Sequence, residues 1–255
     1  IANCEKFKTA GIDCLTTGTK ALWPGAGVFD YMSLRTNGYE WHMDLANGKV
    51  AWTDDSVKKV FAELGKLQPY VTANHAAIDW QDAATLLVQG KAANYVMGNF
   101  AVGVFKEGGM TNDNLGFMAF PEITPGIPRA EEAPTDTIHV TAGAKNVDDA
   151  KKFLAFVATP AACDAQTKAI TPSGPYMVKG CTLPDGLPAA VGDLQKFYTD
   201  GNASPALEFL SPIKGPNLEK ITVEVGSGIT SAADGAKRYD EDVKKQAQQL
   251  GLAGW

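Results

Sequence analysis

Aromatic side chains occur in loops of this chain, where an aromatic face can meet a ligand instead of a core. Trp23 lies in the sequence Leu-Trp-Pro-Gly-Ala-Gly, Phe100 follows a strand-to-turn junction, and Phe209 lies in a proline-flanked loop. Such a face stacks on the apolar C–H side of a sugar, while Asn and Asp side chains hydrogen-bond adjacent hydroxyls. Core packing is the alternative, which Trp23 and Phe100 fit equally well. Core packing is the better interpretation for three further tryptophans, Trp41, Trp52 and Trp80.

Composition excludes several classes of protein. The chain has 255 residues with 23 basic and 29 acidic side chains, a net charge of −6. That balance argues against a nucleic-acid backbone binder, which needs a basic surface. A hydrophobic content of 45% is typical of a globular protein and argues against disorder. No apolar run approaches the ~18 residues that a membrane helix requires.

Motifs for covalent chemistry are missing from the sequence. It contains no P-loop, dinucleotide fingerprint, Gly-x-Ser-x-Gly elbow or His-Glu-x-x-His motif. The three histidines are far from the cysteines, so we expect no metal and no cofactor. A hydrolase with paired carboxylates remains as an alternative, because four acidic residues are available for it: Glu122, Asp136, Glu208 and Glu224.

The four cysteines form two local groups, Cys4 with Cys14 and Cys163 with Cys181. An even number with local grouping favours two disulfides formed in an oxidising compartment. Four cysteines allow three connectivities, of which we prefer the local one. Four reduced, buried thiols are the alternative, because a sequence does not supply the Cα distances that a disulfide requires.

The elements that would position these residues alternate between helix and strand, the pattern of an α/β fold. Val57, Val60, Phe61 and Leu64 recur at helical spacing after Asp54 and predict a helix ending before Pro69. The other predicted elements are helices at 81–89, 187–200, 217–225 and 232–249, strands at 92–97, 115–120 and 137–141, a helix capped by Asn99, and one capped by Asn146.

Two Pro/Gly-rich stretches, 121–134 and 171–175, predict chain crossovers. After the first, Asn146 begins a helix with Ala150, Phe153, Leu154 and Val157 as its expected core stripe. Pro160 then fits the first turn of the next helix.

Four segments, in order, carry a resemblance to a known family. Residues 23–39 resemble its cleft loop and the helix that follows. Residues 86–101, LLVQGKAANYVMGNFA, are similar to its signature of helix, Gly-Lys-Ala-Ala, strand and Gly-x-aromatic. Residues 133–157 resemble its crossing into the other lobe, and residues 171–176, TPSGPY, its return. The family is the maltose-binding-protein-like group of carbohydrate-binding extracellular solute-binding proteins of bacterial ABC importers.

The resemblance implies an α/β, periplasmic-binding-protein-like fold, with ligand in a cleft between two lobes that close by a hinge. Residues 1–120 and 172–255 would form the C-terminal lobe, and residues 121–171 a portion of the N-terminal lobe. Ile1 is not an initiator Met, and residues 1–10 look like the middle of a helix. We therefore expect a fold that is incomplete at the N-terminus, belonging to a longer protein.

The resemblance also implies a set of ligand-binding residues. Phe100 matches the family's stacking aromatic, where Trp is common, and Trp23 and Asn99 fall in matching cleft loops. Asp136 begins the segment that crosses the cleft. The remaining members are Ser173, Gly174 and Tyr176 of the return crossover and Phe209 of a late loop.

By this resemblance the chain would be a non-enzymatic receptor for a mono- or oligosaccharide. It would deliver the sugar to the transmembrane subunits of an ABC permease, and would act as a monomer in the periplasm or outside the cell. Two alternatives stay open: the paired-carboxylate hydrolase, and the same fold with a non-sugar solute such as a polyamine or amino acid.

Overall fold

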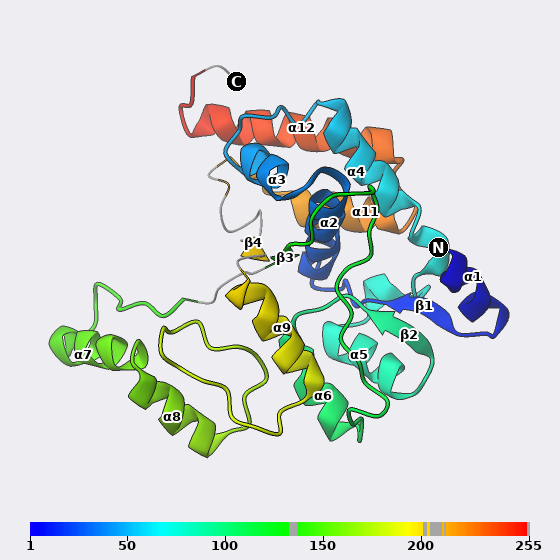
Figure 1. Ribbon diagram of the computed structural model, residues 1–255. Helices are drawn as coiled ribbons and strands as arrows, with labels where there is room; N and C mark the ends of the chain where they lie inside the picture. Colours follow the sequence, from blue (N-terminus) through cyan, green and yellow to red (C-terminus); the bar gives the residue numbers. More distant parts are fainter. Residues whose placement is uncertain (133–136, 201–202, 205–210, 212, 254–255) are drawn as a thin grey trace.

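Two short parallel strands organise the part of the chain that carries the candidate site (Figure 1). The structure is a computed structural model that describes residues 1–132, 137–200, 203–204, 211 and 213–253. β1 (Asp13–Thr16) pairs with β2 (Ala92–Tyr95), Asp13 lying opposite Ala92. Parallel neighbours need a long crossover, which here is a series of helices. The other elements are α1 (Ala2–Thr9), α2 (Trp23–Asn37), α3 (Tyr39–Ala46), α4 (Asp55–Gly65), η1 (Gln68–Tyr70), η2 (His75–Ala77), α5 (Trp80–Val88), η3 (Asn99–Ala101), α6 (Val102–Glu107), β3 (Glu131–Glu132), α7 (Val147–Val157), α8 (Pro160–Ala169), α9 (Ala189–Thr199), β4 (Ala203–Ser204), α11 (Leu218–Gly226) and α12 (Ala232–Gln249).

The main hydrophobic core is helical and lies beside the strands. α2, α4, α11 and α12 pack on one another there. Phe29 of α2 meets Phe61 of α4 with ring centroids 4.6 Å apart, and Trp52 meets Tyr239 of α12 edge to face at 4.5 Å. All four rings are buried, so aromatic packing ties α2 to α4 and ties the segment before α4 to α12.

α4 forms where local sequence signals predict it. The Asp54 side chain accepts a hydrogen bond from the Ser56 N–H at 2.8 Å and so caps the helix. The predicted stripe is buried in the core, which confirms the periodicity: Val57, Val60, Phe61 and Leu64.

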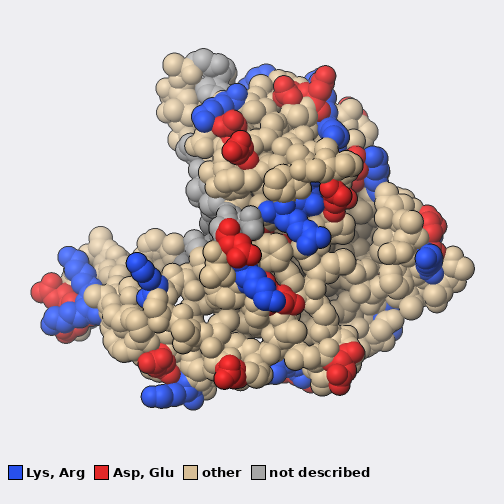
Figure 2. All heavy atoms as spheres, in the orientation of Figure 1, with Lys and Arg blue, Asp and Glu red and all other residues tan. Residues whose placement is uncertain are grey.

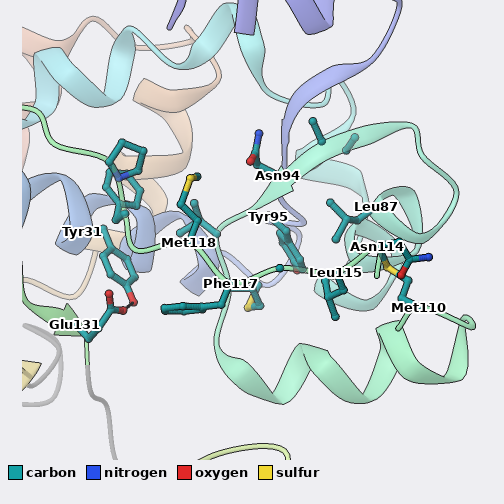
Figure 3. Close-up of a pocket in the computed structure, with 17 residues that line it drawn as sticks. Tyr31, Leu87, Asn94, Tyr95, Met110, Asn114, Leu115, Phe117, Met118 and Glu131 are labelled. Carbon is teal, nitrogen blue, oxygen red and sulfur yellow. Dashed lines mark hydrogen bonds between the residues drawn. The ribbon is translucent and has the colours of Figure 1, made fainter. Parts of the chain in front are cut away.

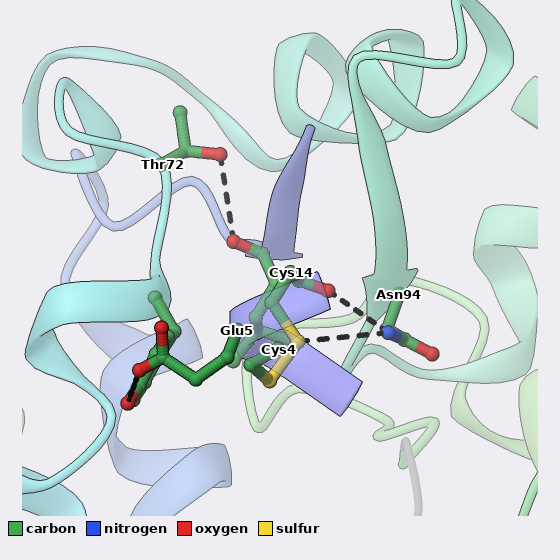
Figure 4. Close-up of a disulfide and its surroundings, with 7 residues drawn as sticks. Cys4, Glu5, Cys14, Thr72 and Asn94 are labelled. Carbon is green, nitrogen blue, oxygen red and sulfur yellow. Dashed lines mark hydrogen bonds between the residues drawn. A yellow bond between two sulfur atoms is a disulfide. The ribbon is translucent and has the colours of Figure 1, made fainter. Parts of the chain in front are cut away.

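A disulfide joins α1 to β1 (Figure 4). Cys4 and Cys14 are bonded, with Cα atoms 4.9 Å apart. Asn94 on β2 donates from Nδ2 to the Cys14 carbonyl at 2.9 Å, and Thr72 donates to the Leu15 carbonyl at 3.5 Å. The start of β1 is therefore held by a covalent bond and by side chains from two other segments.

α7 and α8 form an arm that extends away from the helical core (Figure 1). Both helices occur where predicted, and Pro160 occupies the first turn of α8, but Asn146 at the N-cap of α7 makes no side-chain capping bond. The expected core stripe of α7 is not buried: Phe153 is 58% exposed, and no residue of α7 is classed as buried. A second disulfide, Cys163–Cys181, ties α8 to the segment after the return crossover.

Two predicted strands are wrong. Residues 115–120 and 137–141 have no strand structure, and Ile138 is 59% exposed. The apolar run at 115–120 and the alternation at 137–141 are both compatible with a strand, but a strand also needs a neighbouring edge with which to hydrogen-bond. The extended segment 115–120 runs near β2 without forming such a ladder.

The visible surface mixes the two signs of charge (Figure 2). Lysine and arginine side chains are interspersed with acidic ones over the face shown, and several ion pairs are exposed. None of the helices described here is long and apolar enough to cross a membrane.

Candidate functional site

Trp23 reaches solvent because the backbone before it makes a tight, strained turn. Leu22 has φ 68° and ψ −48°, and Trp23 donates its N–H to the Ala21 carbonyl at 2.9 Å. This is a γ-turn of the rare, strained kind, since positive φ is costly for a residue with a Cβ. Trp23 then begins α2, followed by Pro24, and 41% of Trp23 is exposed.

Phe100 lies in the turn that follows β2. A Cβ on Gly98 would lie 2.3 Å from the Phe100 ring, so only glycine lets the ring fold back over this turn. The ring is 44% exposed. Its centroid is 6.3 Å from that of Trp23, at an interplanar angle of 57°. The two rings that the sequence singled out therefore come together and form an open corner.

Trp80 packs against Phe100 and so supports this corner, a role that the sequence did not reveal. It is half-buried, and its ring meets Phe100 edge to face with centroids 5.0 Å apart. We interpreted Trp80 as core, and it is in part a core residue, packing against a small cluster that includes Ala84 and Phe105. One signal could have indicated more: like Trp23, Trp80 is the first residue of a helix.

The loop before Trp23 is fastened to the start of α5. A Cβ on Gly18 would lie 2.1 Å from the Asp79 carbonyl oxygen, so glycine is required for this contact. Thr19 donates its N–H to the His75 carbonyl at 2.8 Å. Lys20 and Asp79 form an exposed ion pair at 3.0 Å. The charges of these two residues therefore neutralise each other.

Asn99 bridges to the return crossover. Its Nδ2 donates to the Ser173 carbonyl at 2.7 Å, and a Cβ on Gly174 would lie only 1.9 Å from that nitrogen. The structure thus brings three predicted site residues together beside Phe100. The predicted cap is wrong, because Asn99 makes no side-chain cap bond and uses its amide nitrogen for this distant contact.

Tyr176 is directed elsewhere. Its hydroxyl bonds to Thr167 Oγ1 at 2.5 Å and donates to the Cys163 carbonyl at 3.3 Å, both on α8. A hydroxyl used in this way holds the crossover to α8 and is not aimed at the aromatic corner. Asp136 and Phe209 lie outside the described residues.

A pocket of about 300 Å³ lies apart from these rings, between β2 and residues 110–121 (Figure 3). None of the predicted site residues that the structure describes lines it. Its walls present polar and apolar atoms in similar measure, and at one end Tyr31 donates to Glu131 Oε2 at 2.8 Å. Burial raises the pKa of the Glu131 carboxyl and of the Tyr31 hydroxyl. The pocket is therefore closed at that end by a buried hydrogen bond and does not coincide with the aromatic corner.

The carboxylates considered for hydrolysis do not form a pair in the described part of the chain. Glu224 bonds to Arg238 at 2.5 Å, and Glu122 accepts the Gly126 N–H at 2.8 Å. Asp136 and Glu208 lie outside the described residues. Within those same limits, no group of three His, Cys, Asp or Glu side chains is placed to hold a metal ion.

Comparison with known proteins identifies the family. The model of the bacterial extracellular solute-binding proteins matches residues 1–162, more than half of the chain. The chain belongs to this family. The resemblance deduced from the four segments is confirmed, together with the mixed α/β, periplasmic-binding-protein-like fold class.

Several relatives of this solute-binding protein are named for transport. An uncharacterised ABC transporter extracellular-binding protein of Pyrococcus horikoshii is 32% identical over 158 residues, which are 62% of this chain and 35% of the relative. A "probable sugar-binding periplasmic protein" of Mesorhizobium japonicum is 35% identical over 107 residues, 41% of this chain and 25% of the relative.

Solved structures agree in fold. The bacterial solute receptor AcbH, with its exclusive preference for β-D-galactopyranose, superposes with a TM-score of 0.77 at 25% identity, covering 98% of this chain and 63% of AcbH. A chitin oligosaccharide binding protein superposes at 0.73 with 18% identity, covering 96% of this chain and 63% of its own. This solute-binding protein thus spans 25–35% of the length of these two curated relatives, and under two thirds of these solved chains.

Proposed function

We propose that the chain carries the sugar-stacking part of a receptor that captures a mono- or oligosaccharide and delivers it to an ABC permease. The receptor would act outside the cytoplasm, in the periplasm or at the cell surface, as a monomer. It would bind its ligand without cofactor, metal or nucleic acid, and without breaking a covalent bond.

The observation that carries this proposal is the corner made by Trp23 and Phe100. Two half-exposed rings meet at 57°, and a third ring holds one of them in place. A pyranose can stack on one face and meet the edge of the other, gaining dispersion and burying apolar C–H groups. Lys20 and Asp79, which flank the corner in the described part of the chain, neutralise each other as an ion pair, and this favours a neutral sugar over a polyamine.

Two further observations support the division into lobes: residues 1–120 and 172–255 in one, and 121–171 in the other. The α7–α8 arm stands apart from the helical core (Figure 1). No apolar residue of α7 is buried and Phe153 and Phe156 are exposed, as expected for a helix whose partner surface belongs to a different lobe.

Calorimetry with a panel of neutral mono- and oligosaccharides tests the function. We expect saturable binding of at least one sugar and loss of that binding in Phe100→Ala. Tyr39→Ala is the matched control, because Tyr39 is an aromatic residue of similar exposure, 42%, on α3. Absence of binding across the panel, or equal losses in the two variants, would refute the proposal.

The same panel separates the alternatives. Recovering the sugar unchanged after long incubation supports a receptor, whereas cleaved product would favour a hydrolase. A parallel panel of amino acids and polyamines tests the same fold with another solute. Saturable binding there, with none to sugars, would replace the sugar proposal.

A further inference from the structure

We propose that Arg35 and Asn99 are positioning residues that couple the two aromatic rings to the two crossover segments, so that a ligand on the rings fixes the orientation of the arm. The inference rests on the proposed function for its ligand, but its structural basis lies in contacts that do not involve one. The first crossover is defined here as residues 121–131, and the return crossover as residues 171–176.

Arg35 holds the first crossover to α2. It is 3% exposed, and its Nη1 donates to the carbonyls of Ile127 at 3.0 Å and Pro128 at 2.9 Å. Its Nε donates to the Pro121 carbonyl at 3.3 Å. The Arg35 carbonyl in turn accepts the Thr124 N–H at 3.2 Å. One residue thus binds the beginning, middle and later part of this crossover, and a charged donor strengthens three of the four bonds.

Tyr31 adds a second attachment one helical turn earlier. Residues four apart lie on the same face of a helix, so Tyr31 and Arg35 face the crossover together. Tyr31 bonds to Glu131 at 2.8 Å, and its ring stacks on Phe120 with centroids 5.2 Å apart and an angle of 11°. The crossover is therefore fixed to one face of α2 at both of its ends.

Asn99 holds the return crossover. Its bond to the Ser173 carbonyl joins residues 74 positions apart, and the contact is close because Gly174 has no side chain. Asn99 directly precedes Phe100 in the same short helix, η3. Any movement of that helix is passed to the return crossover through this bond.

Each ring therefore shares a rigid element with one crossover attachment. Trp23 is the first residue of α2, and Arg35 lies about 18 Å further along the same helix. Phe100 and Asn99 share η3. A ligand that fixes Trp23 relative to Phe100 fixes α2 relative to η3, and with them the two segments that lead to and from the arm. Arg35 would therefore act on the first crossover through α2, and not through a contact with the ligand.

Distances between two spin labels, measured in the full-length protein, test the coupling. All four native cysteines are in disulfides, so a pair of introduced cysteines can be labelled selectively. One replaces the exposed Lys151 of α7 and the other the exposed Lys237 of α12. The doubly labelled protein with no further substitution should show a shift in the α7–α12 distance when sugar is added. We expect Asn99→Ala to broaden the ligand-free distribution and to lose the shift when saturated with sugar.

Asn47→Ala is the matched control, because Asn47 also donates an exposed amide to a main-chain carbonyl at 2.7 Å, within α3 and its C-terminus. It should retain the narrow distribution and the shift. Arg35→Met should behave as Asn99→Ala does, and Arg35→Lys, which keeps a charged donor, should recover part of the shift. If Arg35→Met does not fold, the comparison of Asn99→Ala with Asn47→Ala decides the test alone.

Retention of the sugar-dependent shift in Asn99→Ala overturns the coupling, even where stability or affinity has fallen. If no sugar binds the unsubstituted protein, the proposed function fails separately. The ligand-free widths then decide the coupling: a broader distribution in Asn99→Ala than in Asn47→Ala supports it, and equal widths overturn it.

Discussion

Replacing Gly18 by alanine should destabilise the loop that presents Trp23. A Cβ at position 18 would lie 2.1 Å from the Asp79 oxygen, whereas contacts below 3.0 Å are essentially never seen, so the two backbones must separate by about 0.9 Å. Separation disrupts two hydrogen bonds, from the N–H groups of Thr19 at 2.8 Å and Lys20 at 3.2 Å. At about 1 kcal/mol for each bond, plus about 1 kcal/mol of residual overpacking, we expect a loss of about 3 kcal/mol.

Urea unfolding followed by far-UV circular dichroism measures this loss. Gly27→Ala is the control, because Gly27 lies inside α2 with nothing within 4 Å of the added methyl. Alanine there should stabilise the helix by about 0.5–1 kcal/mol. Sugar affinity should fall in Gly18→Ala alone, since the loop leads to Trp23. If Gly18→Ala has the same unfolding free energy as the unsubstituted protein, the loop accommodates the methyl group without loss of stability, and the reasoning is refuted.

Three other changes have definite expected outcomes. Replacing Cys4 and Cys14 by serine should lower the unfolding free energy by about 3 kcal/mol, as chain entropy predicts for a sequence separation of 10; equal urea midpoints with and without the bond would contradict this. Burial lowers the pKa of His75, so as the pH falls below about 6.5 the unfolded chain takes up the proton first and stability is lost. His75→Gln should flatten this slope of urea midpoint against pH; an unaltered slope in His75→Gln would show that His75 does not cause the loss of stability. Trp80→Ala should weaken sugar binding about two- to tenfold in calorimetry, the value of one aromatic pair, and unchanged affinity would mean that the ring above it needs no support.

Helices could be predicted from the sequence because their signals are local. The Asp54 cap and the stripe from Val57 to Leu64 lie within one helix and report both its start and its buried face. α7 shows the limit of this reasoning. Its periodicity correctly predicts a helix, but whether Phe153 is buried depends on a partner surface that the pattern of α7 does not contain.

Strands and the candidate site depended on contacts between distant residues. The alternation at 137–141 is compatible with a strand, yet a strand exists only where a second edge pairs with it. Asn99 resembles a helix cap by position, but its amide binds a carbonyl of the return crossover. Trp23 and Phe100 were identified from their loop positions, whereas their 6.3 Å separation and the support from Trp80 follow from tertiary packing.

The parallel pairing of β1 with β2 has a consequence for how the protein acquires its binding surface. Asp13 and Ala92 are paired although they are roughly 80 positions apart, and closing such a loop costs about 4 kcal/mol of chain entropy. Trp23 follows the first strand and Phe100 the second, so the corner between them cannot exist before that pairing is made. High contact order makes this a slow step. Recovery of sugar binding after dilution from denaturant should therefore lag behind the recovery of helical signal, and binding activity can serve as a kinetic marker for the completion of folding.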